Sequence, residues 1–303
     1  MSRSTGDLIA DRRYGYAQSC FDAGDHEGAA DVARAVLELA PGFAPAWALL
    51  GQAEAERGHR DAAITALREA LALEPEDVLG ASITLARLGE LPQAAALTNG
   101  YVRTLFDRYA GAFEDHLTGE LEYRAPEQMR AALDRLAPGR VFASCLDLGC
   151  GTGLMGSAVR ERTTHLTGLD IAPAMVAKAA GKGIYDALVV AELTEYLADL
   201  PAGAHDLILA ADVMVYIGDP AHVLAGAARA LRPGGYFIFS AQSSAQDLPE
   251  GFRIGADARF AHGKDFLRRR ADAAGFTTLL CEPVTTRRDA GEPVPGYLVA
   301  LSL

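Results

Sequence analysis

Three glycines alternate in the segment Gly149–Gly153, which reads Gly-Cys-Gly-Thr-Gly and directly follows an apolar run, Val141–Leu148. Glycines accept positive φ angles and carry no Cβ, so a ligand can approach their backbone closely. The helix predicted next, over 154–162, offers unpaired N–H groups at its start. This order predicts a buried strand, a ligand-binding loop and a helix that together hold a nucleotide or a nucleoside.

Two carboxylates bear on which of these ligands fits. Asp147 stands two residues before Gly149, where it would repel a pyrophosphate and attract a cationic amine. Asp170 ends the next predicted strand, His165–Asp170, where a carboxylate can accept both hydroxyls of a ribose. The glycines run G-x-G-x-G, whereas a dinucleotide loop runs G-x-G-x-x-G. The residues therefore favour a nucleoside with a cationic group, and a nicotinamide-dependent oxidoreductase remains the rival.

The chain from about Tyr101 to Leu303 resembles the class I S-adenosylmethionine-dependent methyltransferases, in the segments CLDLGCGTG, GLDIAPAMV and LRPGG. The resemblance implies an α/β, doubly wound, Rossmann-like sheet of seven strands with an antiparallel last pair. It implies S-adenosyl-L-methionine as cofactor and S-adenosyl-L-homocysteine as product. Methyl transfer mainly requires alignment of the reacting atoms, and a general base only where the acceptor must lose a proton. The remaining strands are expected over 188–193, 205–210, 236–240, 276–283 and 297–303.

The same resemblance assigns the cofactor-binding residues. Asp147 and the loop would hold the methionine part, through Gly149, Cys150, Gly151, Thr152 and Gly153. Asp170 would bind the ribose and Ile171 would lie against the adenine. Glu192 and Leu193 would lie beside the adenine, with Glu192 near its amino group, although the family more often has Asp-Ala there.

The candidates for the acceptor pocket are Asp212 and Tyr216, which follow the fourth strand, and His262. His262 can act as a base near neutral pH, or it can be a surface or supporting histidine. Asp212 can equally brace its own loop. The basic residues nearby either attract an anionic acceptor or form a solvated helix face; they are Arg253, Arg259, Lys264, Arg268, Arg269 and Arg270.

An aromatic-rich helical lead-in, 99–140, precedes the first strand, and in related methyltransferases such a segment closes over the cofactor. By this resemblance Tyr109, Tyr123 and Arg124 would contact the methionine end, with Arg124 as the partner of its carboxylate. The alternative is that Phe106, Tyr109 and Phe113 pack between two domains, because they recur at helical spacing.

The first hundred residues contain a 34-residue repeat: this distance separates Gly24 from Gly58 and Pro41 from Pro75. The pattern resembles tetratricopeptide repeats, and a degenerate third hairpin is expected over 78–87 and 92–107. The predicted domains are thus 1–98, the helical repeats, and 99–303, the methyltransferase domain with lead-in or lid 99–140 and α/β core 141–303. This arrangement also resembles a group of bacterial repeat-fused methyltransferases.

Composition limits the function classes. The 303 residues include 28 Lys and Arg against 40 Asp and Glu, a net charge of −12, of which −7 lies in residues 1–98. This acidity argues against nucleic acid or an anionic membrane as the partner. The four cysteines lack CxxC spacing, so no metal site or disulfide framework is predicted. Without an apolar segment of about 18 residues or a signal-peptide pattern, we expect a cytoplasmic protein.

The sequence thus predicts methyl transfer from S-adenosylmethionine to an unidentified small-molecule or protein acceptor. The alternative is an interaction protein that binds the cofactor without transferring a methyl group, with the repeats carrying its function. For the repeats, three roles are compatible with the pattern: binding a protein partner, self-association, or shielding one face of the second domain.

Overall fold

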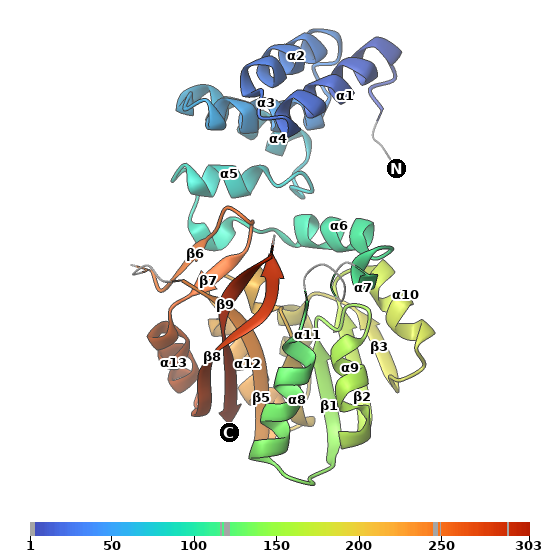
Figure 1. The fold of residues 1–303 in the computed structure, drawn as a ribbon, viewed down its shortest axis with the longest axis vertical. Helices are drawn as coiled ribbons and strands as arrows, with labels where there is room; N and C mark the ends of the chain where they lie inside the picture. The colour runs from blue at the N-terminus through green and yellow to red at the C-terminus, as the bar shows by residue number, and fades with distance from the viewer. Residues whose placement is uncertain (1–3, 116, 118–121, 245–247, 249, 290) are drawn as a thin grey trace. The chain divides into compact units, whose positions relative to one another are not determined.

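The computed structural model describes residues 4–115, 117, 122–244, 248, 250–289 and 291–303. The chain divides into two compact units, Met1–Tyr101 and Val102–Leu303. The first unit is all-helical, and the second is a sheet with helices on both faces (Figure 1).

The first unit repeats a hairpin of antiparallel helices. Its helices are α1 (Leu8–Asp22), α2 (His26–Leu39), α3 (Ala44–Glu56), α4 (Arg60–Leu73) and α5 (Ala81–Arg87). Gly24 and Gly58, with φ of +79° and +77°, form the turns inside the first two hairpins. A Cβ on Gly51 would lie 2.5 Å from Leu67 Cγ, so this glycine lets α3 and α4 approach closely. The predicted 34-residue hairpin repeat is confirmed.

The third hairpin differs from the prediction. Its first helix is shorter, because α5 begins only after Gly80, which has a φ of +74°. The segment 92–107 is not one helix: it holds a short 3₁₀ turn, Gln93–Ala95, and then the start of α6 (Asn99–Tyr109). The hydroxyl of Thr98 accepts the N–H of Tyr101 at 3.1 Å and so caps a new helix there.

The second unit is built on a mixed sheet. Strands β1 to β5 are parallel in the order β3-β2-β1-β4-β5, and β9 and then β8 continue it antiparallel to their neighbours. This confirms the predicted doubly wound sheet with an antiparallel last pair. The strands are β1 (Phe142–Leu148), β2 (Thr163–Asp170), β3 (Ala187–Val190), β4 (His205–Ala210), β5 (Leu231–Ser243), β8 (Thr277–Asp289) and β9 (Glu292–Ser302).

Apolar side chains leave both faces of this sheet, as in a sheet buried on two sides. One face packs against α8 (Ala125–Leu136) and α9 (Leu154–Val159). The other packs against α11 (Leu193–Asp199), α12 (Ala221–Ala230) and α13 (Lys264–Ala273). Helix α10 (Pro173–Gly181) lies against β2 and β3. In the described part of the chain, no helix is long and apolar enough to cross a membrane.

Two strand features were not predicted. β5 runs three residues past the expected Ser240, and there it pairs with β7 (Phe260–His262), which forms a hairpin with β6 (Phe252–Ile254). β8 and β9 are longer than expected, because they continue as a paired hairpin up to Asp289 and Glu292. Both features extend the sheet beyond the carboxyl ends of β1, β2 and β4, where the predicted site residues lie.

Candidate active site

The glycine loop joins β1 to α9 and is held tightly by its neighbours. Gly149, Gly151 and Gly153 have φ of +62°, +52° and +93°, which only glycine adopts without strain. A Cβ on Gly149 would lie 2.5 Å from Val213 Cγ2. The N–H of Cys150 donates to the carbonyl of Leu169 at 2.8 Å, which fixes the loop to the end of β2.

Asp147 lies beneath this loop and is fully buried. Its Oδ2 accepts a hydrogen bond from the hydroxyl of Tyr185 at 2.6 Å. Its Oδ1 is buried and has no hydrogen-bond partner among the described residues. Burial and the nearby Asp170 raise the pKa of Asp147 to about 7, and the hydrogen bond from Tyr185 and the backbone amide of Gly156 oppose this shift.

Asp170 ends β2 and faces the loop. Its Oδ2 accepts the N–H of Gly151 at 2.9 Å and its Oδ1 accepts the N–H of Ala172 at 2.8 Å. Burial raises the pKa of Asp170, and these two amides oppose the shift. A carboxylate has about four acceptor positions, so both oxygens keep capacity for ribose hydroxyls. Ile171 follows directly and is half-buried.

Two further residues of the loop and two after β3 also belong to the predicted cofactor set. Thr152 and Cys150 are buried, and burial together with two nearby carboxylates raises the pKa of the Cys150 thiol. The side chain of Glu192 accepts the N–H of Glu195 at 2.8 Å and so caps α11. Leu193 begins α11 and packs on the sheet core. The adenine contact of Glu192 stays a prediction.

The lead-in packs onto the edge of the sheet that carries the loop. The ring of Phe113, in α7 (Phe113–Asp115), is the nearest neighbour of a Cβ added to Gly151, at 3.6 Å. Asp107 Oδ1 accepts the N–H of Ala174 at 3.0 Å, at the start of α10. Lys182 forms an ion pair of 2.6 Å with Glu114. Residues 116 and 118–121 of the predicted lid lie outside the described residues.

The three predicted residues of the lead-in lie in different surroundings. Tyr109 packs edge-on against Phe113, with ring centroids 5.2 Å apart. Burial and the nearby carboxylates of Asp212 and Asp147 raise the pKa of Tyr123 well above its usual value, so this phenol lies among the site's acids. Arg124 is exposed, and its backbone N–H donates to the Thr286 carbonyl at 2.7 Å.

Asp212 follows β4 with a φ of +57° and is held by three polar contacts with two residues. Its N–H donates to Ser240 Oγ at 2.8 Å, and Ser240 Oγ donates to its Oδ1 at 3.3 Å. Its Oδ2 forms an ion pair of 2.9 Å with Arg287. The Arg287 side chain is 1% exposed and also donates to Gln242 Oε1 at 2.6 Å. Neither Arg287 nor Tyr185 was predicted, because no motif marks them.

Tyr216 and His262 differ in what they contact. Tyr216 packs against Phe106, with ring centroids 5.2 Å apart, and its hydroxyl lies 3.5 Å from Arg259 Nε. His262 is fully buried; its Nε2 contacts the carbonyls of Ile217 and Gly218 at 2.9 and 3.0 Å. Burial lowers the pKa of His262. These contacts favour a supporting role for His262.

The predicted basic residues that the structure describes in detail lie in different surroundings. Arg268 and Arg269 lie on the exposed side of α13, and Arg270 forms an ion pair with Asp219. Arg259 is half-buried beside Tyr216. Among the described residues, no group of three or more His, Cys, Asp or Glu side chains is placed to hold a metal ion.

The residues at the end of β1 and β2 fit the predicted cofactor. Asp147 is a buried carboxylate with an unpartnered oxygen, and a buried carboxylate without a partner is costly. A cationic amine bound at this oxygen would compensate that cost. A Cβ on Gly151 would be in ordinary contact with the ring of Phe113, so this ring lies over the glycine loop, and Asp170 offers acceptor capacity for a ribose.

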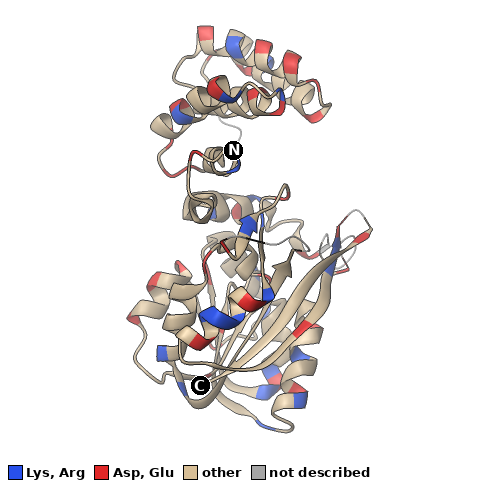
Figure 2. Cartoon of the chain, turned by 90° about the vertical axis from the view of Figure 1, so that its left-hand side faces the viewer, with Lys and Arg blue, Asp and Glu red and all other residues tan. Residues whose placement is uncertain are grey.

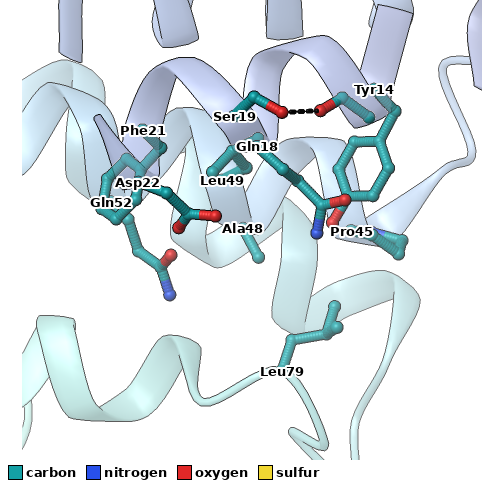
Figure 3. Close-up of a pocket in the computed structure, with 11 residues that line it drawn as sticks. Tyr14, Gln18, Ser19, Phe21, Asp22, Pro45, Ala48, Leu49, Gln52 and Leu79 are labelled. Carbon is teal, nitrogen blue, oxygen red and sulfur yellow. Dashed lines mark hydrogen bonds between the residues drawn. The ribbon is translucent and has the colours of Figure 1, made fainter. Parts of the chain in front are cut away.

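The first unit contains a groove of about 460 Å³ between α1, α3 and the segment before α5. Gln18, Asp22 and Gln52 point into it, with Leu49 and Leu79 as apolar contacts (Figure 3). None of the described residues that line this groove is Lys or Arg.

Comparisons with known proteins agree with this geometry. The profile of a family described as a methyltransferase domain matches residues 121–280, and a tetratricopeptide repeat profile matches 21–88. A malonyl-[acyl-carrier protein] O-methyltransferase from Salmonella typhimurium is 31% identical over 172 residues, 56% of this chain and 64% of that protein. A ubiquinone biosynthesis O-methyltransferase from Hahella chejuensis is 32% identical over 114 residues, 37% of this chain and 45% of that protein. The chain therefore spans less than two thirds of both relatives.

Solved structures show the fold. An S-adenosylmethionine-dependent methyltransferase from Leishmania major matches with a TM-score of 0.52 and 18% identity, over 67% of this chain and 82% of that chain. A complex of the Trm112 methyltransferase activator and a methyltransferase from Haloferax volcanii matches with a TM-score of 0.50 and 19% identity, over 65% of this chain and 96% of that one.

The family profile covers more than half of the chain and includes the loop, Asp147, Asp170 and Asp212. The sheet order and the two carboxylates at the glycine loop are those expected for a site that takes S-adenosylmethionine. The chain belongs to the S-adenosylmethionine-dependent methyltransferases, with tetratricopeptide repeats ahead of the methyltransferase domain.

Proposed function

We propose that this chain transfers the methyl group of S-adenosylmethionine to an oxygen atom of its acceptor. The observation that carries this proposal is the Asp212 carboxylate, held at the end of β4 by Arg287 and Ser240. Both relatives named above are O-methyltransferases, which supports oxygen as the acceptor atom.

The cofactor side has defined tasks. When bound, S-adenosylmethionine supplies a methyl group that its sulfonium already activates. Asp147 would pair with the ammonium of the cofactor, and Asp170 with its ribose. Ile171, Glu192 and Leu193 would border the adenine. In this proposal residues 99–140 act as a lid, whose Tyr109, Tyr123 and Arg124 face the methionine end and exclude water.

Asp212 has one oxygen suited to receive a proton. Arg287 occupies Oδ2 with a 2.9 Å ion pair, whereas Oδ1 has only a long contact of 3.3 Å from Ser240. As an acceptor hydroxyl attacks, its proton would pass to Asp212 Oδ1 and then to solvent. A carboxylate acceptor would need no such transfer. Tyr216 would line the acceptor pocket, and the buried His262 would support the loop after β4.

The test is a labelling experiment on cell extract. The full-length protein is incubated with extract and with S-adenosylmethionine labelled in its methyl group, and the products are treated with mild alkali. Mild alkali releases the label of a methyl ester in volatile form. Methyl ethers and N- or C-methyl products keep the label, and mass spectrometry then identifies which atom of the product carries the methyl group. Label on oxygen supports the proposal, and label on nitrogen or carbon contradicts it.

Substitution separates the role of Asp212 from cofactor binding. With a hydroxyl acceptor, Asp212→Asn should lower kcat about 100-fold while the Kd for S-adenosylhomocysteine changes less than twofold. Asp289→Asn, at the exposed end of the same hairpin that carries Arg287, is the matched control. Equal kcat values for the Asp212 variant and the control would show that Asp212 does not accept the proton of the acceptor hydroxyl.

We also propose that the repeats, residues 1–98, bind an extended basic segment of a protein partner or acceptor. The groove offers side-chain amides and the Asp22 carboxylate but no cationic lining residue, and the region carries −7 of the charge. Self-association through the same helices is the competing outcome. A cytoplasmic location belongs to this proposal, since the four cysteines are free and buried.

A further inference from the structure

Tyr185 occupies a slot that three glycines leave open. It stands in the short segment between α10 and β3. A Cβ added to Gly153, at the end of the loop, would lie 3.1 Å from its ring. On Gly156 in α9, a Cβ would lie 2.3 Å from its hydroxyl oxygen, and on Gly168 in β2 it would lie 2.8 Å from its ring. Three elements thus meet at one ring, and a side chain at Gly156 or Gly168 would overlap it.

The slot directs the phenol toward the buried acid of the site. The Tyr185 hydroxyl donates to Asp147 Oδ2 at 2.6 Å, a short distance typical of a hydrogen bond to a carboxylate. The other oxygen of Asp147 is buried and without a partner among the described residues. One oxygen is therefore restrained, and the second has unused hydrogen-bonding capacity that a cationic ligand group could satisfy.

We propose that Tyr185 is a positioning residue for the cofactor: its hydroxyl orients the Asp147 carboxylate and stabilises the charge, so that Oδ1 can bind the α-ammonium group of S-adenosylmethionine. The inference rests on the cofactor site of the proposed function. The proposal also explains why Gly156 and Gly168 are glycines, because a side chain at either position would displace the ring that holds Asp147.

The electrostatic surroundings explain why a donor is needed. The titratable groups that interact with Asp147 are Tyr185, Asp170, Cys145, Cys150 and Tyr123. None of these groups carries a positive charge. A buried carboxylate among them takes up a proton unless a hydrogen bond favours its charged form, and a protonated acid no longer attracts an ammonium group. Tyr185 supplies the side-chain hydrogen bond, and the backbone amide of Gly156 also favours the charged form.

The test compares two ligands on the full-length protein by calorimetry. S-Adenosylhomocysteine carries the α-ammonium group, whereas 5′-methylthioadenosine lacks the amino-acid end. Tyr185→Phe keeps the ring in its slot and removes the hydroxyl. We expect the Kd for S-adenosylhomocysteine to rise about 10-fold and the Kd for 5′-methylthioadenosine to change less than twofold. Equal weakening of both ligands, or no change in either, would overturn the proposal.

The pH dependence gives a second readout. Affinity for S-adenosylhomocysteine should fall as the pH drops through the titration of Asp147, because the protonated acid loses its attraction for ammonium. Removing the Tyr185 hydrogen bond destabilises the carboxylate, so Tyr185→Phe should move the midpoint to higher pH. An unmoved midpoint contradicts a role through Asp147. Tyr236→Phe, which removes a phenol hydroxyl from the same face of the sheet, should leave midpoint and Kd unchanged.

Two further variants separate the possible failures. In an Asp147→Asn background, Tyr185→Phe should have little additional effect on the Kd for S-adenosylhomocysteine, since the two residues act as one unit. Asp170→Ala should weaken both ligands, because both contain the ribose. If Asp170→Ala changes the affinity for neither ligand, the proposed cofactor site is wrong. If Asp170→Ala weakens the binding of both ligands and Tyr185→Phe has no selective effect, only the role of Tyr185 is wrong.

Discussion

Asp147 is a single residue whose placement is unfavourable for the free protein. Its side chain is fully buried, so its charged form is costly in the free protein. One oxygen accepts a hydrogen bond from Tyr185, and the other has no partner among the described residues. Folding tolerates such a group when a ligand compensates it, and functional sites are where such groups gather. In the proposed cofactor site, this residue would link stability in the free protein to affinity for a cationic ligand.

This linkage has a definite sign. Burial raises the pKa of Asp147 to about 7 from 3.8, so between these values the folded state binds more protons than the unfolded state. The free energy of unfolding should therefore fall as the pH rises from 4 to 7. Asp147→Asn removes this term, and its stability advantage should grow over that range to at most about 4 kcal/mol.

Urea unfolding of the ligand-free proteins at several pH values measures this difference. The exposed Asp289→Asn serves as the control, and its curve should run parallel to that of the unsubstituted protein. Parallel curves for Asp147→Asn as well would mean that Asp147 titrates alike in the folded and unfolded states. Saturation with S-adenosylhomocysteine should remove the advantage of the variant.

At the scale of elements, the long β8–β9 hairpin places the charged side chain of Arg287 beside Asp212. Had β8 ended at Pro283, as expected, Arg287 would lie outside the sheet. Instead β8 runs to Asp289 and pairs with β9 as far as Glu292, with a register shift between Thr285 and Arg287. This places the buried Arg287 side chain against Asp212 and Gln242. The extension of β5 to Ser243 brings Gln242 to the same place.

Breaking this ion pair should cost stability. Arg287→Met leaves the Asp212 carboxylate without its cation, and loss of one partner of a buried pair typically costs about 3–5 kcal/mol. Adding Asp212→Asn should restore part of that loss, because the uncompensated charge is then gone. Thermal and urea unfolding of the two variants measure this difference. A double variant no more stable than Arg287→Met would show that Arg287 contributes by packing alone.

At the scale of the whole molecule, the two units differ in charge. Residues 1–98 hold −7 of the total −12 in about a third of the length. Acidic and basic positions stand side by side along the helices of the repeat unit (Figure 2). The acidity of the chain therefore describes the repeats more than the catalytic unit, and it does not exclude an anionic acceptor.

The groove proposal predicts a preference for cationic peptides. A fluorescent ten-residue lysine-rich peptide should bind the full-length protein more tightly than a glutamate-rich one, with a difference that shrinks as salt rises. Asp22→Lys should weaken the lysine peptide about tenfold. Glu38→Lys makes the same charge change on α2, outside the groove lining, and is the control. If both variants weaken binding of the lysine-rich peptide equally, the preference comes from net charge and not from the groove.

The sequence by itself determined the fold class, and it marked most of the residues that we propose for the cofactor side. Alternating glycines, an acid before them and an acid after the next strand depend on backbone geometry over a few residues, so they are readable locally. The hairpin repeat is likewise local, because its period recurs in the chain. The broken third hairpin was missed because the Thr98 cap, which resets the helix, leaves no periodic signal.

Only the tertiary structure decided which distant residues complete the site. Tyr185 lies 38 residues from Asp147, and Arg287 lies 75 residues from Asp212. Their roles depend on a slot formed by three glycines of different elements and on a hairpin longer than its apolar pattern. His262 shows the converse: its type suggested a base, but burial and two carbonyl contacts favour a supporting role. Contacts between segments far apart in the chain arise from packing, which residue type and spacing do not encode locally.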